Sequence, residues 1–240
     1  MNQYSISEVK RLAESEREQL LERVYQLMRN GVVVRDPHRL DIRGELICVR
    51  GVELDINVIV EGNVVLDEGV KIGANSILID CKIGRGTIIN PFSLVEGAVI
   101  GEQSFVGPYG RVRPGSRVGD QVQIGNFVEV KNANIASYCR INHLSFVGDA
   151  DLAEHVTMGA GTITCNHDGV GINRTTIEEG AYIGSGCELV APLRVNRNAT
   201  VASGSTITED VAGEALTVAR ARQVTVEGWQ GPKSRKETNT

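Results

Sequence analysis

The chain has 240 residues, enough for one or two domains with a sizeable core. Aromatic residues make up only 4% of it, so the core must be built from Val, Ile, Leu and Ala, which suits narrow, uniform layers. The net charge of −5 gives no reason to expect nucleic acid or an anionic membrane as a partner.

The N-terminal segment lacks the apolar core of a signal peptide, and no uncharged apolar run approaches membrane-spanning length. The five cysteines include no CxxC pair, which argues against a disulfide framework or a zinc cluster. A reducing compartment fits this cysteine usage best. We therefore expect a cytoplasmic protein with no membrane partner.

Residues 5–30 are predicted to form one helix, capped by Ser5 or Ser7 with Glu8 in its first turn. Its apolar stripe is clean only in the second half, because Arg17 falls on the stripe. The stripe consists of Leu20, Leu21, Val24, Leu27 and Met28. Residues 32–44 read as a connector with a Pro turn, so 1–44 is the first unit.

A small aliphatic residue then recurs every six residues from about Leu54 to Ile207, with five-residue steps at 78–83, 95–100, 130–135 and 147–152. This period fits neither an amphipathic helix nor an alternating strand. It fits one short strand and one turn per six residues, three such units completing a triangular coil. We predict a mainly β fold, a left-handed parallel β-helix over 45–210. Each aliphatic side chain should stack on the one about eighteen residues away.

The repeat is lost over 163–176 and stops near Thr208. An insertion in such a coil becomes a loop that protrudes from one face, commonly at a binding site. The C-terminal arm and tail occupy 211–240. We expect Trp229 to anchor an ordered arm and the last ten residues to be mobile.

Arg113 and Lys131 are eighteen residues apart, so coil geometry places both cations together, as an anion site for a phosphate would need. Two solvated surface charges are the alternative. His143 falls on the same side of the prism and is a candidate general base, with a structural histidine as the alternative. The Gly-rich run 158–166 could offer backbone amides to an oxyanion or a thioester carbonyl.

His143, His155 and His167 are spaced twelve apart, which invites a metal site. Twelve residues correspond to two faces of the prism, so the three imidazoles should point in different directions within one chain. We therefore expect no metal.

Several motifs together resemble one family. The motifs are RVRPGS (111–116), GNFVEVK (125–131), NHLSFVGDA (142–150), MGAGTITCNHDG (158–169) and IGSGCELVAP (183–192), extended by RDPHRLDIRG (35–44), DINVIVEGNV (55–64) and EGWQGP (227–232). They resemble the acetyltransferase half of the bifunctional bacterial N-acetylglucosamine-1-phosphate uridyltransferase/glucosamine-1-phosphate acetyltransferases (GlmU). No GxGTRM-type nucleotide loop precedes the helix, so the uridyltransferase activity is expected to be missing.

The resemblance implies a homotrimer with three active sites at subunit boundaries, acetyl-CoA as donor and a 2-amino sugar 1-phosphate as acceptor. By motif position, Arg113 and Lys131 would hold the sugar phosphate. His143 would take the proton from the attacking amine. Asn166 would contact the sugar or help to orient that histidine.

On the donor side, the resemblance implies that the backbone at Ala160 binds the acetyl carbonyl. Ser185 and Ser203 would line the CoA arm, and Arg220 would pair with a CoA phosphate. This chemistry requires a base near pH 7 and donors aimed at the oxyanion, and it needs neither a metal nor a covalent enzyme intermediate.

The sequence departs from the family at four positions on the acceptor side. Phe146 and His167 replace tyrosines, Thr157 replaces an asparagine, and Ile172 stands where the family has a lysine. Each change alters a polar contact to the acceptor, and a site built to hydrogen-bond one substrate discriminates strongly. A different amino sugar, such as a nucleotide-linked one, is therefore an alternative acceptor.

Two other functional classes stay open: a non-catalytic trimeric scaffold, and a γ-carbonic-anhydrase-like enzyme with zinc shared across subunits. Retention of His143, Ser185 and Arg220 favours the acetyltransferase. The sequence thus predicts an acetyl-CoA-dependent N-acetyltransferase in cell-envelope sugar precursor synthesis, for peptidoglycan or lipopolysaccharide.

Overall fold

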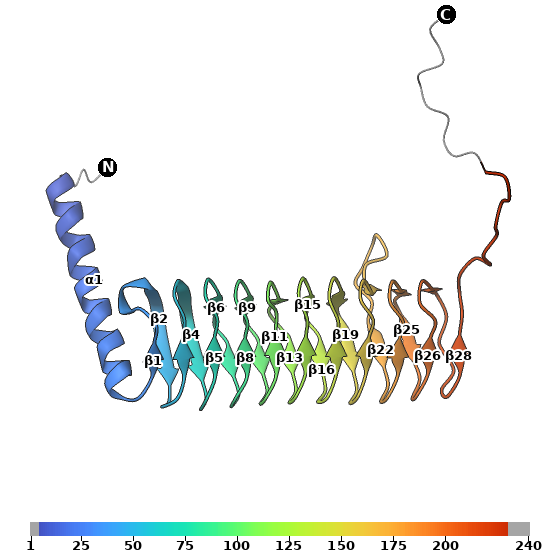
Figure 1. The fold of residues 1–240 in the computed structure, drawn as a ribbon, viewed down its shortest axis with the longest axis horizontal. Helices are drawn as coiled ribbons and strands as arrows, with labels where there is room; N and C mark the ends of the chain where they lie inside the picture. Colours follow the sequence, from blue (N-terminus) through green and yellow to red (C-terminus); the bar gives the residue numbers. More distant parts are fainter. Residues whose placement is uncertain (1–4, 230–240) are drawn as a thin grey trace, which may run out of the picture.

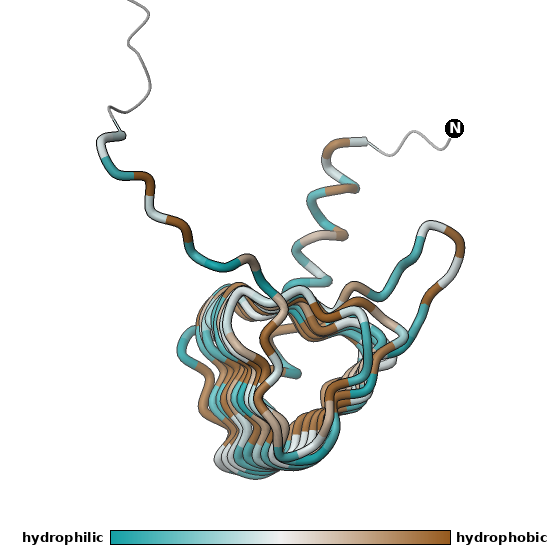
Figure 2. The backbone as a smooth tube through the Cα atoms, turned by 90° about the vertical axis from the view of Figure 1, so that its right-hand side faces the viewer, coloured by the Kyte–Doolittle hydropathy of each residue, from teal (hydrophilic) through white to brown (hydrophobic). Residues whose placement is uncertain are grey.

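The computed structural model describes residues 5–229, which form an N-terminal helix followed by a long left-handed parallel β-helix (Figure 1). Viewed along its axis, the β-helix is a three-sided prism with superimposed coils (Figure 2). This confirms the predicted fold. Within residues 5–229 the structure contains no helix with the length and apolar character needed to cross a bilayer.

Helix α1 (Ile6–Arg29) lies at the N-terminal end of the prism. Ser5 caps it through a capping box with Glu8, as the sequence predicts. Val24 is fully buried against the first coil. Arg17 lies on the apolar stripe, where its guanidinium donates hydrogen bonds to backbone oxygens of the connector. The connector includes the 3-10 helix η1 (Pro37–Arg39).

The first face of the prism is an eleven-stranded parallel sheet. Its strands are β1 (Val33–Val34), β3 (Glu53–Leu54), β5 (Lys71–Ile72), β8 (Ile88–Ile89), β11 (Phe105–Val106), β14 (Gln123–Ile124), β17 (Arg140–Ile141), β20 (Thr157–Met158), β23 (Tyr182–Ile183), β26 (Thr200–Val201) and β28 (Leu216–Thr217).

The second and third faces share the long strands β2 (Leu40–Cys48) and β4 (Val58–Leu66), which bend around the corner between them. The second face continues with β6 (Ile77–Ile79), β9 (Leu94–Glu96), β12 (Arg111–Val112), β15 (Glu129–Lys131), β18 (Phe146–Gly148), β21 (Ile163–Cys165), β24 (Glu188–Val190) and β27 (Thr206–Ile207). The third face continues with β7 (Lys82–Ile83), β10 (Val99–Ile100), β13 (Arg117–Val118), β16 (Asn134–Ile135), β19 (Ala150–Leu152), β22 (Thr175–Ile177) and β25 (Leu193–Val195).

We name the corners in chain order: corner I joins the first and second faces, corner II the second and third, and corner III the third and first. Over residues 40–158, stacked inward residues are seventeen or eighteen positions apart, as in the series Val112, Val130 and Val147. All three are fully buried. The predicted stacking is confirmed, and each of the four five-residue steps falls at corner II.

The insertion is narrower than the predicted break at 163–176. Thr164 occupies the inward position opposite Leu189, and Ile177 is buried in register with Leu152. A polar threonine in the aliphatic series makes the repeat look broken there. The true insertion spans 166–174 and forms a hairpin at corner II, closed by an antiparallel bridge between His167 and Ile172 (Figure 2).

Strand pairing extends beyond 45–210 at both ends, through β1 and β28. The arm that follows leaves the prism (Figure 1). Trp229 is 73% exposed, so it does not anchor the arm within this chain, contrary to the prediction. The ten C-terminal residues, predicted to be mobile, lie outside the described part.

Candidate active site

Five predicted site residues lie along corner I on successive coils. The register of β17, β20, β23 and β26 aligns His143, Ala160, Ser185 and Ser203. The next coil's backbone amide donates to the carbonyl oxygen of each of the first three, at 3.0, 2.8 and 2.8 Å. Arg220 Nη1 then donates to the Ser203 oxygen at 2.7 Å. We call this row the corner I column.

Glycines allow the coils to approach each other closely along this column. An added Cβ on Gly159 would overlap the backbone of Ser185, and one on Gly184 would overlap that of Ser203. These two glycines belong to the MGAG and IGSG motifs. The motifs therefore serve the packing of successive coils as well as any ligand.

His143 is exposed at the start of the column. Within the described residues, its imidazole has no side-chain hydrogen-bond partner. Both ring nitrogens are thus free to meet a substrate, as a general base requires.

Apolar side chains continue the line of corner I toward the N-terminus. Phe92, Tyr109 and Phe127 stack with ring centroids 5.0 and 5.1 Å apart, all with positive φ. Leu144, directly after His143, occupies the next position with φ 61°. These side chains are 17 or 18 residues apart in the sequence, which equals one coil. This spacing is a signal for the coil length that is independent of the six-residue repeat.

Arg113 and Lys131 lie next to each other on the second face, as predicted: the Arg113 amide donates to the oxygen of Val130 at 2.8 Å. Each cation already has a carboxylate partner. Arg113 Nη1 is 2.8 Å from Glu129 Oε1, and Lys131 Nζ is 3.8 Å from Asp149 Oδ2. A phosphate bound there would compete with these carboxylates.

Phe146 lies on the same face, in register with Glu129 and Ile163. Its ring covers Gly148, since an added Cβ there would overlap the ring carbons. The same Cβ would lie 3.0 Å from Asn166 Nδ2. The ring and the Asn166 amide therefore lie close together on the second face.

Asn166 lies at corner II, at the end of the second face opposite to His143. Its Nδ2 donates to Asp149 Oδ2 at 2.5 Å. Within this chain the amide therefore contacts Asp149 rather than His143.

Thr157 and His167 lie apart from this cluster. Thr157 is on the first face, between Arg140 and Tyr182, on the far side of corner I. His167 is exposed in the hairpin, where its Nδ1 accepts a hydrogen bond from the Gly169 amide at 3.0 Å. One chain does not bring these two residues together with Phe146.

Asp168 orders the turn of the hairpin. Its carboxylate accepts hydrogen bonds from the amides of Val170 and Gly171 and from Asn173 Nδ2, at 2.7–2.9 Å. These donors lower the pKa of Asp168 from its ordinary 3.8 to about 2, the backbone amides contributing most. Ile172, the residue that replaces a family lysine, is 58% exposed on this hairpin.

Sequence reasoning assigned no role to Glu129, Asp149 or Arg174, which the structure places in contact with predicted site residues or their hairpin. The sequence does indicate that Asp149 lies next to Lys131, because it follows eighteen residues later, one coil further on. No motif marked the carboxylates as partners of these cations.

The three histidines lie at different places around the prism, as predicted. His143 is at corner I, His155 is at corner III stacked on Tyr138 at 4.8 Å, and His167 is in the hairpin at corner II. Among residues 5–229 no group of three or more His, Cys, Asp or Glu side chains could hold a metal ion.

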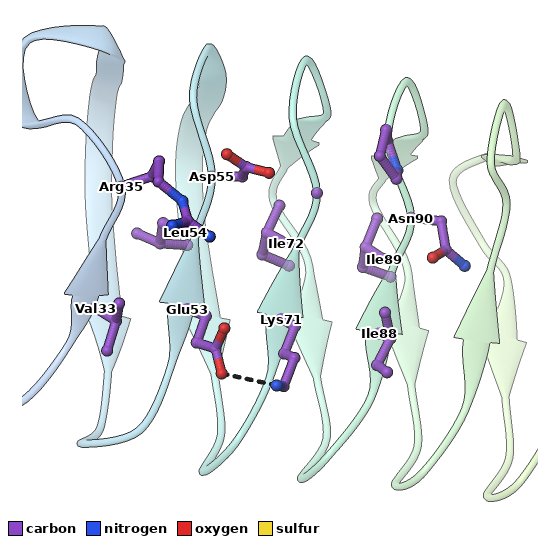
Figure 3. A pocket seen from close by; sticks show the side chains of 12 residues that line it. Val33, Arg35, Glu53, Leu54, Asp55, Lys71, Ile72, Ile88, Ile89 and Asn90 are labelled. Carbon is purple, nitrogen blue, oxygen red and sulfur yellow. Dashed lines mark ion pairs between the residues drawn. The ribbon is translucent and has the colours of Figure 1, made fainter.

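A cavity of about 140 Å³ lies on the first face near the N-terminal end (Figure 3). Val33, Ile88 and the ion pair of Lys71 Nζ with Glu53 Oε1 at 2.7 Å help to line it. It contains no predicted site residue. The candidate site is instead an exposed corner and its adjoining face.

The chain is similar to known proteins over most of its length. The family model described as the GMPPB C-terminal domain matches residues 42–147. The bifunctional protein GlmU of Azoarcus sp. (strain BH72) is 51% identical over 218 residues, covering 88% of this chain and 48% of that protein. The bifunctional protein GlmU of Methylococcus capsulatus is 53% identical over 237 residues, covering 95% and 51%.

Among solved structures, LpxA from Acinetobacter baumannii matches with a TM-score of 0.60 at 14% identity, over 70% of this chain and 71% of that one. At this identity the likeness concerns the fold alone. The chain spans about half the length of the curated relatives it matches. It belongs to the GlmU family and corresponds to the C-terminal, β-helical part of its members.

Proposed function

We propose that this chain is an acetyl-CoA-dependent N-acetyltransferase that acts on an amino sugar 1-phosphate, glucosamine 1-phosphate, in cell-envelope precursor synthesis. The observation that carries the proposal is the corner I column. It lines up the candidate base His143 with all four predicted donor-binding residues, beside the face that bears Arg113 and Lys131.

The column suits a long, extended donor. Five positions on successive coils, about 4.8 Å apart, span about 19 Å. A thioester at the His143 end and a phosphate at the Arg220 end would match the order of the residues. Acetyl-CoA supplies the activated acetyl group, and this chain supplies binding and proton transfer.

His143 would remove a proton from the amino group as its nitrogen attacks the thioester carbonyl carbon. The C–N bond forms, the C–S bond breaks, and the sulfur leaves with the electron pair and takes up a proton. The Ala160 N–H, which has no acceptor within the described chain, would donate to the carbonyl oxygen.

On the acceptor side, Arg113 and Lys131 would bind the phosphate, because charge-assisted contacts from two adjacent cations suit an anion. Asn166 and Phe146 would line the sugar. Before the phosphate binds, the carboxylates of Glu129 and Asp149 hold the side chains of Arg113 and Lys131 in place.

A different amino sugar is the second candidate acceptor. Phe146 presents a ring without a hydroxyl beside Asn166, and Ile172 places an apolar side chain on the exposed hairpin. Thr157 and His167 complete the altered set. Activity on glucosamine 1-phosphate at an efficient rate would exclude this candidate.

We further propose a homotrimer in the cytoplasm, in which a neighbouring prism covers corner I. In the single chain His143, Ser185 and Ser203 are all exposed. Acyl transfer gains from an environment that excludes water, and a second prism would supply it. Sedimentation of the purified protein as a monomer at assay concentration would contradict this assembly.

The deciding experiment measures release of free CoA from acetyl-CoA with a panel of amino sugars, for the wild type and His143→Ala. Loss of the base should lower kcat by about 10²–10⁴-fold. His155→Ala, at corner III, is the matched control and should retain activity. Equal rates for the wild type and His143→Ala on every acceptor would refute the catalytic assignment.

Two inexpensive measurements separate the other classes. Calorimetric titration with acetyl-CoA should show binding, whereas a scaffold would show none. Elemental analysis of the purified protein should show no stoichiometric zinc, whereas a γ-carbonic-anhydrase-like enzyme would retain it.

A further inference from the structure

Asp149 is a buried carboxylate at corner II, one coil before the hairpin. Its side chain is only 5% exposed, and its backbone is left-handed with φ 48°. A carboxylate in such a place is costly unless several groups satisfy it.

Three side chains from neighbouring coils surround this carboxylate. Asn132 Nδ2 donates to Oδ1 at 2.6 Å, and Asn166 Nδ2 donates to Oδ2 at 2.5 Å. Lys131 Nζ lies 3.8 Å from Oδ2. A single residue thus contacts two of the predicted acceptor-binding side chains.

The chemistry of the carboxylate fixes how the amides are turned. An ionised carboxylate can only accept hydrogen bonds, so Asn132 and Asn166 must both point their NH₂ groups toward it. The Oδ1 atom of each amide is then directed away from Asp149. Consistently, Asn132 Oδ1 lies on the opposite side, 3.0 Å from where a Cβ on Gly115 would be.

We propose that Asp149 is a positioning residue for acetyl transfer, which fixes the Asn166 amide and the Lys131 ammonium in the orientations that bind the amino sugar phosphate. This inference rests on the proposed function. The left-handed backbone alone does not require a carboxylate, because Gly97 and Gly115 occupy the same corner II position on preceding coils.

The test is a double-mutant cycle of Asp149→Asn and Asn166→Ala, read as kcat/KM for the amino sugar phosphate. Asparagine has the same shape as aspartate, but its own NH₂ group must then face the NH₂ group of either Asn132 or Asn166, so one of these hydrogen bonds is lost. Asp149→Asn should lower kcat/KM about 10–100-fold, as loss of an orienting partner does elsewhere. In the Asn166→Ala background the loss should shrink by about tenfold, since coupled residues are not additive. Equal losses in both backgrounds would overturn the inference.

Asp80→Asn is the matched control. Asp80 occupies the same corner II position with φ 44°, several coils away from Asp149. Among the described residues, its carboxylate accepts a hydrogen bond only from the Asn63 backbone amide, at 2.8 Å. Its substitution should leave kcat/KM unchanged. Thermal unfolding of each variant separates folding from positioning. If Asp149→Asn does not fold, Asp149→Gly, the residue at positions 97 and 115, takes its place in the cycle.

A measurement without substrate separates this inference from the proposed function. The Asn173 backbone N–H donates to the backbone carbonyl oxygen of Asn166 at 2.7 Å, so its hydrogen–deuterium exchange reports whether the chain at Asn166 is held in place. Asp149→Asn should speed this exchange at least about tenfold, and unchanged exchange would overturn the role of Asp149. A wild type inactive on every amino sugar would instead overturn the proposed function, whatever the exchange shows.

Discussion

Arg174 closes the base of the hairpin through a bidentate ion pair with Asp151. Its Nε and Nη2 lie 2.6 and 2.7 Å from the two carboxylate oxygens, and Nη2 also donates to the oxygen of Ala150 at 3.1 Å. The hydrogen bonds from Arg174 lower the pKa of Asp151. The hairpin therefore leaves the prism from a fixed base at corner II.

Arg174→Lys should loosen the hairpin with little effect on global stability. Lysine keeps the charge but cannot bind both oxygens of Asp151 in a fork. The pair is about 40% exposed, so its contribution to unfolding free energy should stay below about 1 kcal/mol. Hydrogen–deuterium exchange over 166–174 should rise while the thermal midpoint stays nearly constant. A large fall in the midpoint would show instead that the pair supports the coils.

The order of the hairpin turn should survive mild acid. The pKa of Asp168 is about 2 in the folded chain against an ordinary 3.8. A carboxyl group with a lowered pKa stabilises the fold fully above its ordinary value, and the contribution is lost as pH falls from about 4 toward 2. Exchange or NMR signals of Val170 and Gly171 should therefore change only in that interval. Asp168→Asn should abolish this pH dependence, and an unchanged transition in the variant would contradict the assignment.

Thr164→Val should destabilise the protein although it restores the aliphatic repeat. The Thr164 hydroxyl accepts from the Gly148 amide at 2.8 Å and donates to the Gly148 oxygen at 2.9 Å, both fully buried. Valine has the same shape but leaves these groups unpaired, at a cost of about 1–3 kcal/mol. Chemical denaturation measures this cost, and Thr164→Ser, which keeps the hydroxyl, is the comparison. A valine variant as stable as the wild type would show that the hydroxyl is dispensable.

Arg113→Gln and Lys131→Gln should each raise KM for the sugar phosphate by about tenfold or more, since a hydrogen bond to a charged group contributes about 1.5–3 kcal/mol. KM for acetyl-CoA should change little, because both residues lie on the second face and not on the corner I column. Arg85→Gln, a cation paired more loosely with Glu102 at 3.9 Å, is the control. Equal effects on both substrates would contradict a phosphate role.

The five free cysteines should differ widely in reactivity. Burial raises the pKa of Cys81 to about 12 and that of Cys139 to about 11, so neither thiol is ionised near pH 8. Cys165, half-buried on the second face one coil beyond Gly148, should react first with iodoacetamide. Bound amino sugar phosphate should slow that reaction. Labelling of Cys81 before Cys165 in the folded protein would contradict this order.

Much of the fold could be predicted because a six-residue repeat fixes which side chains point inward. The same periodicity, counted over three faces, aligns residues on successive coils. The alignment of Arg113 with Lys131 and the inward stacking of Val112 on Val130 followed from it directly.

The remaining features depend on contacts that no periodicity encodes. Thr164 looks like a break in the repeat, because a polar residue in the core is recognisable only through its hydrogen bonds to Gly148. The side-chain partners of Asp149 come from the coils before and after it, and their meeting requires the five-residue steps at corner II to be placed correctly. The exposure of Trp229 depends on where the arm leaves the prism, which its sequence does not specify.

The corner I column also makes the prism a molecular ruler. Each coil contacts only its neighbours and adds a fixed rise, so the distance from His143 to Arg220 is set by the number of coils between them. Removing one coil, the eighteen residues 183–200, would bring Arg220 about 4.8 Å closer to His143 without altering either end. On the proposed function, the column would therefore match donors of different length only in steps of one whole coil.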